Sequence, residues 1–343
     1  MVITKKIKHL LVIRLSAMGD VAMLVPVLRV LKSKYPELKI TVLTRKFLKP
    51  IFDSDITGVD INFHEADTKG KHKGILGIFK LAKEIRTLKI DAIADTHNVL
   101  RSKIVRFFLF GIKNVVINKG RTEKKALTRT ENKIYKQLQT THERYADVFK
   151  RLGFTIDLTK HQFPTKTTLP KLPFLSNIAE DGKKWIGIAP FAQYSGKMYP
   201  LDLMEKVIEK LAQNKQIFLF GGGKKEVELL NEIAEKYKTV LNIAGKLSLK
   251  EELVLISHLD TMLAMDSGNA HFSAMFGIKT ITLWGVTHPY AGFAPFLQRE
   301  NCILPDIDTY PNIPCSIYGN KVCEGYDEVM RSISIEKIIK KIE

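Results

Sequence analysis

A short polar segment between two apolar runs has the residue types of an anion-binding helix start. It reads Asp266-Ser267-Gly268-Asn269-Ala270-His271. Asp266 or Ser267 can cap the helix that this segment opens, and the N–H groups of the first turn then attract an anion. The same residues also suit an ordinary capped turn between a strand and a helix. Gly268 and His271 beside the cap, and the quick return to a strand, favour a ligand site.

A carboxylate follows the first apolar run of the chain. The run Leu10–Ile13 leads into the turn Ser16–Asp20, and a helical pattern begins at Val21. If the run is a strand of a parallel sheet, Asp20 lies at the edge where open α/β sheets bind ligands. There it can act as a general base toward a hydroxyl within hydrogen-bond reach, and the competing interpretation is a helix N-cap.

Two further loops follow apolar runs in the second half of the chain. In the loop after 185–189, Lys197 can neutralise a phosphate, or it is an ordinary solvated lysine. Glycines at 221–223 let a ligand approach the backbone, and Glu226 follows them. Neither GxGxxG nor GxxxxGK[ST] occurs, which excludes the dinucleotide fingerprint and the P-loop.

Apolar runs alternate with helical patterns through the whole chain. The predicted strands lie at 10–13, 39–44, 92–94, 114–117, 185–189, 216–220, 240–243, 259–265 and 280–284. Strands that alternate with helices form parallel βαβ units. We therefore predict an α/β protein with two doubly wound parallel sheets, and we expect the ligand in a cleft between the two domains.

A proline-rich stretch with little periodicity divides the chain at 161–182. We predict that this stretch is a linker between a first domain, 1–160, and a second domain, 183–325. Residues 326–343 have the pattern of a final amphipathic helix.

The positive charge is unevenly distributed. The formal net charge is +18, and residues 1–160 hold 33 basic against 15 acidic residues, whereas 161–343 hold 21 of each. This surplus indicates an anionic partner for the first domain, such as a phosphorylated glycan or an acidic membrane surface. The basic segment 119–136 is either a solvated surface or a clamp for phosphates and carboxylates. Without aromatic platforms or recognition motifs, we expect no nucleic-acid binding.

Cysteine and carboxylate patterns exclude several other sites. Cys302, Cys315 and Cys323 form no CxxC and are odd in number, which favours a reducing compartment, and we assign them no catalytic role. No histidine completes a zinc site, and the carboxylate pairs at 53/55 and 306/308 follow no convincing strand, so we expect no metal site. No stretch of about 18 uncharged apolar residues occurs, so we expect no transmembrane span and a cytoplasmic location.

Three of these motifs together resemble glycosyltransferase family 9, the lipopolysaccharide heptosyltransferases. They are Ile13–Val21, the loop through Lys197–Pro200, and Asp266–His271 with the following Leu283–Thr287. The segments Ile90–Asp95 and His142–Tyr145 also fit, so the likeness covers nearly the whole chain. It implies a GT-B fold, in which two Rossmann-like domains face a central cleft. The first would bind the acceptor, the second the nucleotide-sugar, and the final helix would pack back toward the first.

The resemblance also implies roles for individual residues. Asp20 matches the proposed catalytic base, Glu226 would face the nucleoside ribose, and Arg144 is an acceptor-side candidate. The donor-side positions are Lys197, Asp266, Ser267, Gly268 and His271. Lys197 and the helix start would stabilise the departing diphosphate. We therefore expect that neither a cofactor nor a metal is required, with Mg²⁺ as a counter-ion at most.

The implied reaction moves a heptose, with inversion, from ADP-L-glycero-D-manno-heptose to the Kdo or heptose of the lipopolysaccharide inner core. The acceptor is then an anionic glycolipid of the lipid A–Kdo type, and the protein would be peripheral to the inner face of the cytoplasmic membrane in a Gram-negative bacterium. Phe191, Ala192 and Gln193 stand where several members have small hydroxyl residues, which leaves the donor sugar open. The alternatives are a member with another nucleotide-sugar or a surface-glycan acceptor, and a non-catalytic nucleotide-sugar-binding protein. A pure binder needs no base at Asp20.

Overall fold

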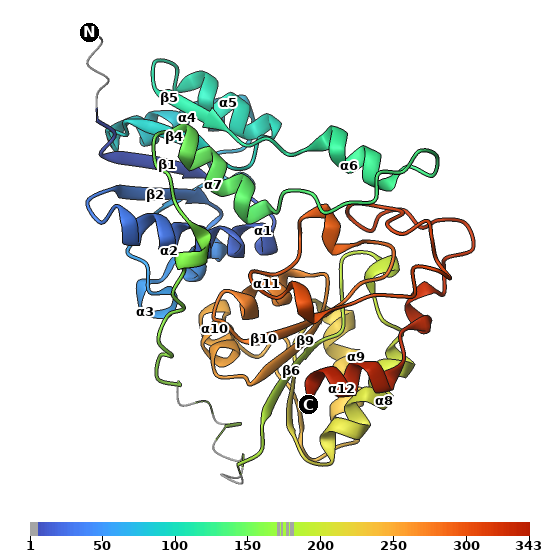
Figure 1. Ribbon diagram of the computed structural model, residues 1–343. Helices are drawn as coiled ribbons and strands as arrows, with labels where there is room; N and C mark the ends of the chain where they lie inside the picture. Colours follow the sequence, from blue (N-terminus) through green and yellow to red (C-terminus); the bar gives the residue numbers. More distant parts are fainter. Residues whose placement is uncertain (1–5, 170–171, 173, 176–177, 179–181) are drawn as a thin grey trace. The chain divides into compact units, whose positions relative to one another are not determined.

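The computed structural model describes residues 6–169, 172, 174–175, 178 and 182–343 (Figure 1). Contacts divide the chain into two compact units. The first comprises residues up to Lys119 together with Thr141–Thr165, and the second comprises Gly120–Thr140 and Lys166–Glu343. Part of the predicted linker 161–182 lies outside the described residues.

The first unit is built on a five-stranded parallel sheet in the order β3-β2-β1-β4-β5. Its strands are β1 His9–Ile13, β2 Lys39–Thr44, β3 Asn62–Glu65, β4 Ala92–Asp95 and β5 Lys113–Val116. β1 is completely buried between β2 and β4, which explains its continuous apolar run. The apolar runs predict four of these strands but miss β3, an edge strand whose residues are all partly exposed.

Helices and short 3₁₀ turns surround this sheet. They are α1 Met18–Ala22, α2 Leu24–Lys34, α3 Ser54–Thr57, α4 Gly74–Thr87, α5 Leu100–Phe108, α7 Thr141–Arg151, η1 Lys46–Phe52 and η2 Leu158–Lys160. One face of α4 and α5 is apolar and buried: Ile78 and Leu81 of α4 and Val105 of α5 join Leu11 and Ile13 of β1 in one core. These two helices therefore cover one side of the central strand.

The second unit contains a six-stranded parallel sheet in the order β11-β10-β9-β6-β7-β8. Its strands are β6 Trp185–Ala189, β7 Gln216–Leu219, β8 Val240–Asn242, β9 Thr261–Met265, β10 Lys279–Leu283 and β11 Cys302–Ile303. Its helices and turns are α6 Arg121–Thr128, α8 Leu201–Ala212, α9 Lys224–Ala234, α10 Leu249–Ser257, α11 Gly268–Ala274, α12 Ile335–Ile342, η3 Ser195–Lys197, η4 Pro289–Ala291, η5 Arg299–Asn301 and η6 Val329–Ser332. The prediction of an α/β protein with two parallel sheets is confirmed. In the described part of the chain, no helix combines the length and apolarity needed to cross a bilayer.

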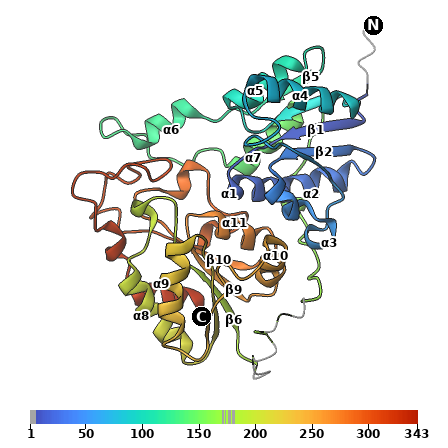
Figure 2. The same ribbon diagram turned by 180° about the vertical axis from the view of Figure 1, so that it is seen from behind.

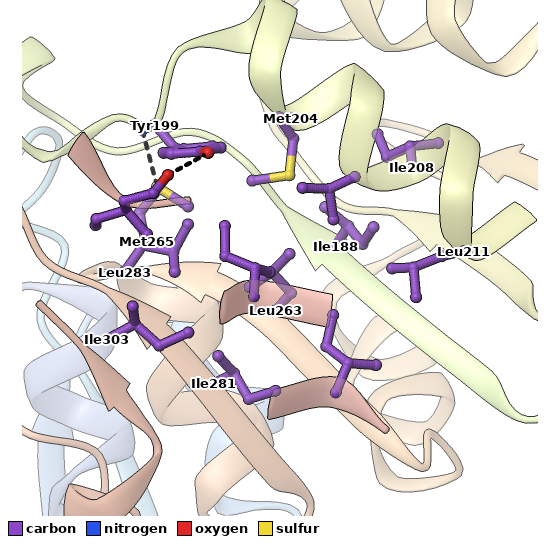
Figure 3. Close-up of a cluster of buried hydrophobic side chains, with 14 of the residues drawn as sticks. Ile188, Tyr199, Met204, Ile208, Leu211, Leu263, Met265, Ile281, Leu283 and Ile303 are labelled. Atoms are coloured by element: carbon purple, nitrogen blue, oxygen red, sulfur yellow. Dashed lines mark hydrogen bonds between the residues drawn. The ribbon is translucent and has the colours of Figure 1, made fainter. Parts of the chain in front are cut away.

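The core of the second unit joins the central strands to α8 (Figure 3). Ile188, Leu263 and Ile281 come from three neighbouring strands and pack with residues of α8 such as Met204 and Ile208. Tyr199 ends the loop that precedes α8. Its hydroxyl donates to the carbonyl of Ile333 at 2.7 Å, and its N–H contacts the sulfur of Met265 at 3.2 Å. These bonds fix the loop between β6 and α8, which carries Lys197.

The basic segment 120–140 belongs to the second unit, although we predict it in a first domain of residues 1–160. Leu127 and Leu138 form a small buried cluster with Ala291. The N–H of Leu138 donates to the carbonyl of Tyr290 at 2.9 Å, and Lys133 Nζ donates to the carbonyl of Asn312 at 2.6 Å. The local sequence pattern of the segment does not indicate these contacts, because their partners lie more than 150 residues later in the chain. The second unit therefore holds the segment in place, and its role as a solvated surface or as a clamp for phosphates and carboxylates stays a prediction.

The final helix, α12, packs on α8 within the second unit. Ser334 caps it by accepting from the N–H of Lys337, and Ile338 and Ile342 are buried in the core of that unit. α12 is thus an integral part of the second unit. The packing of this helix toward the first domain, which the family resemblance implies, stays a prediction.

Replacing Ile338 with alanine should lower the unfolding free energy of the second unit by about 2–5 kcal/mol, because it leaves a cavity under α12. Both tryptophans of the chain, Trp185 and Trp284, lie in this unit, so tryptophan fluorescence during urea unfolding reports on it alone. Lys340→Ala, at an exposed position of the same helix, should stay within about 0.5 kcal/mol of the wild type. Equal urea midpoints for the two variants would contradict this packing.

Candidate functional site

In the first unit, Arg14 and Asp20 form an ion pair beyond the carboxyl end of β1. Arg14 Nη2 lies 2.6 Å from Asp20 Oδ2, and Arg14 Nη1 donates to the carbonyl of Thr96 at 2.7 Å. The N–H of Ala17 donates to the same carboxylate oxygen at 3.1 Å. The Arg14 side chain is only 8% exposed, whereas that of Asp20 is 28% exposed. The guanidinium thus anchors the carboxylate from the interior.

Tyr145 of α7 completes this cluster. Its hydroxyl donates to the backbone carbonyl of Asp20 at 3.1 Å, and the Arg14 guanidinium lies 5.8 Å from the centre of its ring. Burial raises the pKa of Tyr145, against the opposing effect of Arg14. Burial disfavours the charge on Arg14, but the Asp20 carboxylate bonded to the guanidinium helps to raise the pKa of Arg14 above its ordinary value. Tyr145 therefore stays protonated and Arg14 stays charged, so neither exchanges protons near neutral pH.

A neutral histidine supports the turn before Asp20. His97 follows β4, and its Nδ1 accepts from the N–H of Leu15 at 3.3 Å. Burial lowers the pKa of His97 to about 3, and the positive charges of Arg14 and Lys119 add to the effect. The sequence analysis missed His97, because its partner lies 82 positions earlier in the chain.

Arg144, the predicted acceptor-side residue, is buried on α7. It donates from Nη1 to the carbonyl of Asn118 at 3.2 Å, just beyond the carboxyl end of β5. Asp95 at the end of β4 is fully buried, and its carboxylate accepts from Arg106 Nε at 2.9 Å. Both residues shape loops at the edge of the sheet that also holds Asp20. The role of Arg144 as an acceptor ligand stays a prediction.

In the second unit, Lys197 and Asp266 form another largely buried ion pair. Lys197 Nζ lies 2.9 Å from Asp266 Oδ2, and the two side chains are 13% and 9% exposed. The hydroxyl of Thr287 donates to the same oxygen at 3.1 Å. These residues follow β6, β9 and β10, which are neighbours in the sheet. Three adjacent strand ends thus place one ammonium group beside the start of α11.

The start of α11 differs in one respect from the expected cap. Ser267 is the N-cap residue, but its side chain makes no capping bond, and the carboxylate of Asp266 is directed to Lys197 and Thr287. The buried Ser267 hydroxyl has no hydrogen-bond partner within the described part of the chain. Gly268 opens the helix and His271 is buried in it. A buried hydroxyl of this kind is suited to bonding a ligand oxygen.

Glu226 holds the glycine loop after β7. Its Oε2 accepts from the N–H of Gly222 at 2.8 Å. A Cβ at Gly221 would lie 3.2 Å from that oxygen and 2.9 Å from Leu230 Cδ1, so both side chains pack closely on this glycine. The structure gives Glu226 this loop-shaping role, and its contact with a ribose stays a prediction.

A loop of residues 315–323 lies against Lys197. The N–H of Cys315 donates to the carbonyl of Val286 at 2.9 Å, which ties the loop to the end of β10. Gly319 has a φ of +84°, and a Cβ there would overlap the Cγ and Cδ atoms of Lys197. The loop backbone therefore confines the Lys197 side chain close to Asp266.

Cys315 and Cys323 form a disulfide that closes this loop. We predict a reducing compartment from the odd number of cysteines, but an odd number also allows one bridge and one thiol, which is the arrangement found here. The remaining cysteine, Cys302, is not in a disulfide, and burial raises the pKa of its thiol to about 11. Cys302 is consequently a poor nucleophile at neutral pH.

The two spaced carboxylate pairs stabilise turns. Asp53 accepts from the N–H of Asp55 at 3.1 Å, and Asp306 accepts from the N–H of Asp308 at 3.1 Å. Within the described ranges, no group of three or more His, Cys, Asp or Glu side chains could hold a metal ion. The role of Mg²⁺ as a counter-ion stays a prediction.

Comparison with known proteins shows the family to which the sequence is similar. A sequence profile described as glycosyltransferase family 9 (heptosyltransferase) matches residues 78–316. The chain is 31% identical over 184 residues to lipooligosaccharide heptosyltransferase 2 of Campylobacter jejuni, and the match covers 50% of this chain and only 56% of that protein. It is 25% identical over 306 residues to the lipopolysaccharide core heptosyltransferase OpsX of Haemophilus influenzae, covering 88% of this chain and 85% of OpsX.

Solved structures share the fold. The glycosyl transferase family 9 structure from Veillonella parvula has a TM-score of 0.75 at 19% identity, covering 97% of this chain and 96% of that one. The E. coli heptosyltransferase WaaC with ADP has a TM-score of 0.65 at 19% identity, covering 98% and 100%. Likeness at this identity shows the fold alone, and that fold is GT-B.

His97 should remain neutral between pH 8 and pH 5. Because its folded pKa is depressed to about 3 from an ordinary 6.5, the unfolded chain takes up a proton that the folded chain refuses. His97 therefore lowers stability progressively as the pH falls from about 6.5 toward 3. In NMR titrations of the histidine rings, the His97 resonance, assigned by comparison with His97→Asn, should not shift between pH 8 and pH 5. A midpoint near pH 6.5 would contradict its burial.

Proposed function

Because the chain belongs to glycosyltransferase family 9, the heptosyltransferase family, we propose that it transfers a heptose, with inversion, from ADP-L-glycero-D-manno-heptose to the Kdo or heptose inner core of lipopolysaccharide. The observation that carries the proposal is the carboxylate of Asp20, held by Arg14 beyond the central strand β1 and still partly exposed. A glycosyl transfer with inversion needs one base and a stabilised leaving group, and no covalent enzyme intermediate.

Asp20 is the proposed base. It accepts the proton of the acceptor hydroxyl as that oxygen attacks the anomeric carbon from the face opposite ADP. Arg14 and the Ala17 N–H fix the direction of the carboxylate, and Tyr145 holds the backbone of Asp20. Because the carboxylate is already oriented, less conformational entropy is lost when it meets the acceptor hydroxyl in the reactive geometry.

Lys197 is the proposed partner of the departing diphosphate. It is already confined beside the start of α11 by Asp266 and Gly319, so little reorganisation is needed when charge develops on the leaving group. Ser267 and His271 are proposed to contact the same diphosphate, and Glu226 the ribose. ADP bound to the related WaaC supports an ADP-sugar donor. Mg²⁺ is proposed as a counter-ion at most.

The acceptor is proposed to be an anionic glycolipid. The first unit, as the structure delimits it, contains 27 Lys and Arg against 13 Asp and Glu. It therefore carries most of the positive net charge of the chain, although the basic segment 120–140 belongs to the second unit. A positive surface attracts the phosphates and carboxylates of a lipid A–Kdo type acceptor. We propose Arg144 as one of its ligands and a peripheral position at the inner leaflet.

The direct test is to incubate the protein with a panel of nucleotide-sugars and truncated core acceptors and to identify products by mass spectrometry. We expect one heptose to be added only from the ADP-heptose. Transfer from a different nucleotide-sugar would replace the donor assignment. Binding of ADP-heptose without transfer to any acceptor would favour the non-catalytic alternative.

Asp20→Asn should lower kcat by about 10²–10⁴-fold, because the amide cannot accept the proton. Binding of ADP, measured by calorimetry, should change by less than about threefold if the donor contacts lie on other residues. Circular dichroism checks that the fold survives the loss of the Arg14 partner. Asp55→Asn, an exposed position of the same unit, serves as the control and should retain full activity. Wild-type turnover in Asp20→Asn would remove Asp20 as the base.

A further inference from the structure

The outer faces of α4 and α5 expose an unusual number of large apolar side chains. Leu76 is 84% exposed, Phe107 73% and Phe110 78%. The α4–α5 face is defined here by these residues and three others, Ile75, Phe79 and Leu100. The buried sides of the same helices already form the core with β1, so these side chains are not needed for folding of the sheet. Apolar side chains gathered in this way mark an interaction surface.

Aromatic contacts link the two helices that carry these side chains. The rings of Phe79 in α4 and Phe108 in α5 meet edge to face at 5.1 Å, and Phe107 contacts Phe108 at 5.5 Å. Arg86 of α4 donates to the carbonyl of Phe108 at 2.9 Å and lies 5.4 Å from the ring centre of Phe110. The two helices lie side by side in both views (Figures 1 and 2). The contacts thus join α4 to the C-terminal end of α5.

The charge on these helices is of one sign. α4 and α5 contain the basic residues Lys80, Lys83, Arg86, Arg101 and Lys103, together with Arg106, which is engaged by the buried Asp95. Their one acidic residue, Glu84, is already engaged by Lys71 at 3.5 Å and His72 at 3.3 Å. Lys83 Nζ lies 4.7 Å from the ring centre of Phe79, so cationic and apolar groups are interleaved. Aromatic and aliphatic side chains among lysines and arginines are typical of surfaces that enter the headgroup region of anionic membranes.

The face reaches the sheet edge that holds Asp20. Leu100 begins α5 five residues after Asp95, and Asp95 pairs with Ile13 at the end of β1. Arg14, the partner of Asp20, bonds the carbonyl of Thr96 between these points. A protein seated on a bilayer through this face would keep the first unit's site close to lipid-linked molecules.

We propose that the α4–α5 face docks the protein on a bilayer surface containing anionic lipids. Its apolar side chains enter the boundary between headgroups and acyl chains, and the surrounding Lys and Arg side chains bind lipid phosphates. The basic residues of these helices favour a lipid surface over a second copy of the chain. The one acidic residue, Glu84, is already paired, so two such faces would repel each other. The docking itself does not depend on the proposed transfer reaction, but its use for a glycolipid acceptor does.

The test is flotation of the full chain with vesicles of phosphatidylcholine, with or without phosphatidylglycerol. The wild type should float with the anionic vesicles and much less with the neutral ones, and raising the salt should weaken the binding. The double variant Leu76→Ser and Phe107→Ser should bind at least about tenfold more weakly. Its matched control is Phe47→Ser, which removes a half-exposed apolar side chain from η1.

A charge variant separates the two contributions. Lys80→Ser with Lys103→Ser should weaken binding to anionic vesicles, whereas Lys206→Ser with Lys238→Ser, at exposed positions of the second unit, should not. Transfer to a water-soluble truncated acceptor should be unchanged in all of these variants, so failure of docking is distinguishable from failure of the proposed reaction. Absence of wild-type flotation at low salt, or equal binding by face and control variants, would overturn the proposal. A wild-type dimer in light scattering that Leu76→Ser with Phe107→Ser converts to a monomer, without flotation, would assign the face to self-association.

Discussion

Parallel strand pairing is the constraint on which both candidate sites depend. Because all strands of each sheet run in one direction, their carboxyl ends lie on one edge, and each strand passes there into a loop before its helix. Asp20 lies in the first turn of α1, just after β1, and Lys197 and Asp266 lie in the segments that follow β6 and β9. Order within the sheet then decides which loops meet. β6 and β10 flank β9, so Lys197 and Thr287 reach the same carboxylate oxygen from either side.

Each site contains a cation with a carboxylate partner. Because the cations are largely buried, the loss of either partner affects stability more than it would at the surface. Removing one member of a buried pair typically costs about 3–5 kcal/mol, because the other charge stays in the interior without compensation. Arg14 and Lys197 therefore cannot be treated as surface charges, although a lone loop lysine is usually one. In the proposed reaction, an incoming diphosphate would have to share Lys197 with Asp266. This competition lowers the net gain from binding but supplies a cation that is already positioned.

The fold and the first members of each site could be predicted because their signals are local. The apolar run of β2 ends where the strand ends, and Asp20, Lys197 and Asp266 each follow such a run. Their partners could not be predicted, because they depend on contacts between distant positions. His97 meets Leu15 across 82 residues, and Leu127 joins Ala291. The resemblance to a family identified Asp20 but gave no role to Arg14 or Tyr145, whose functions follow from distances.

The placement of Gly120–Thr140 has a consequence for how this chain can be divided. The segment lies between two parts of the first unit in sequence and folds with the second, so the backbone passes from one unit to the other three times. A cut in the proline-rich stretch would produce a first fragment that still carries Leu127 and Leu138 without Ala291, and a second fragment lacking the residues that cover Ala291. The two units are therefore compact bodies but not separable genetic modules. A gene fusion or domain exchange with this chain would have to transfer both pieces of the second unit together.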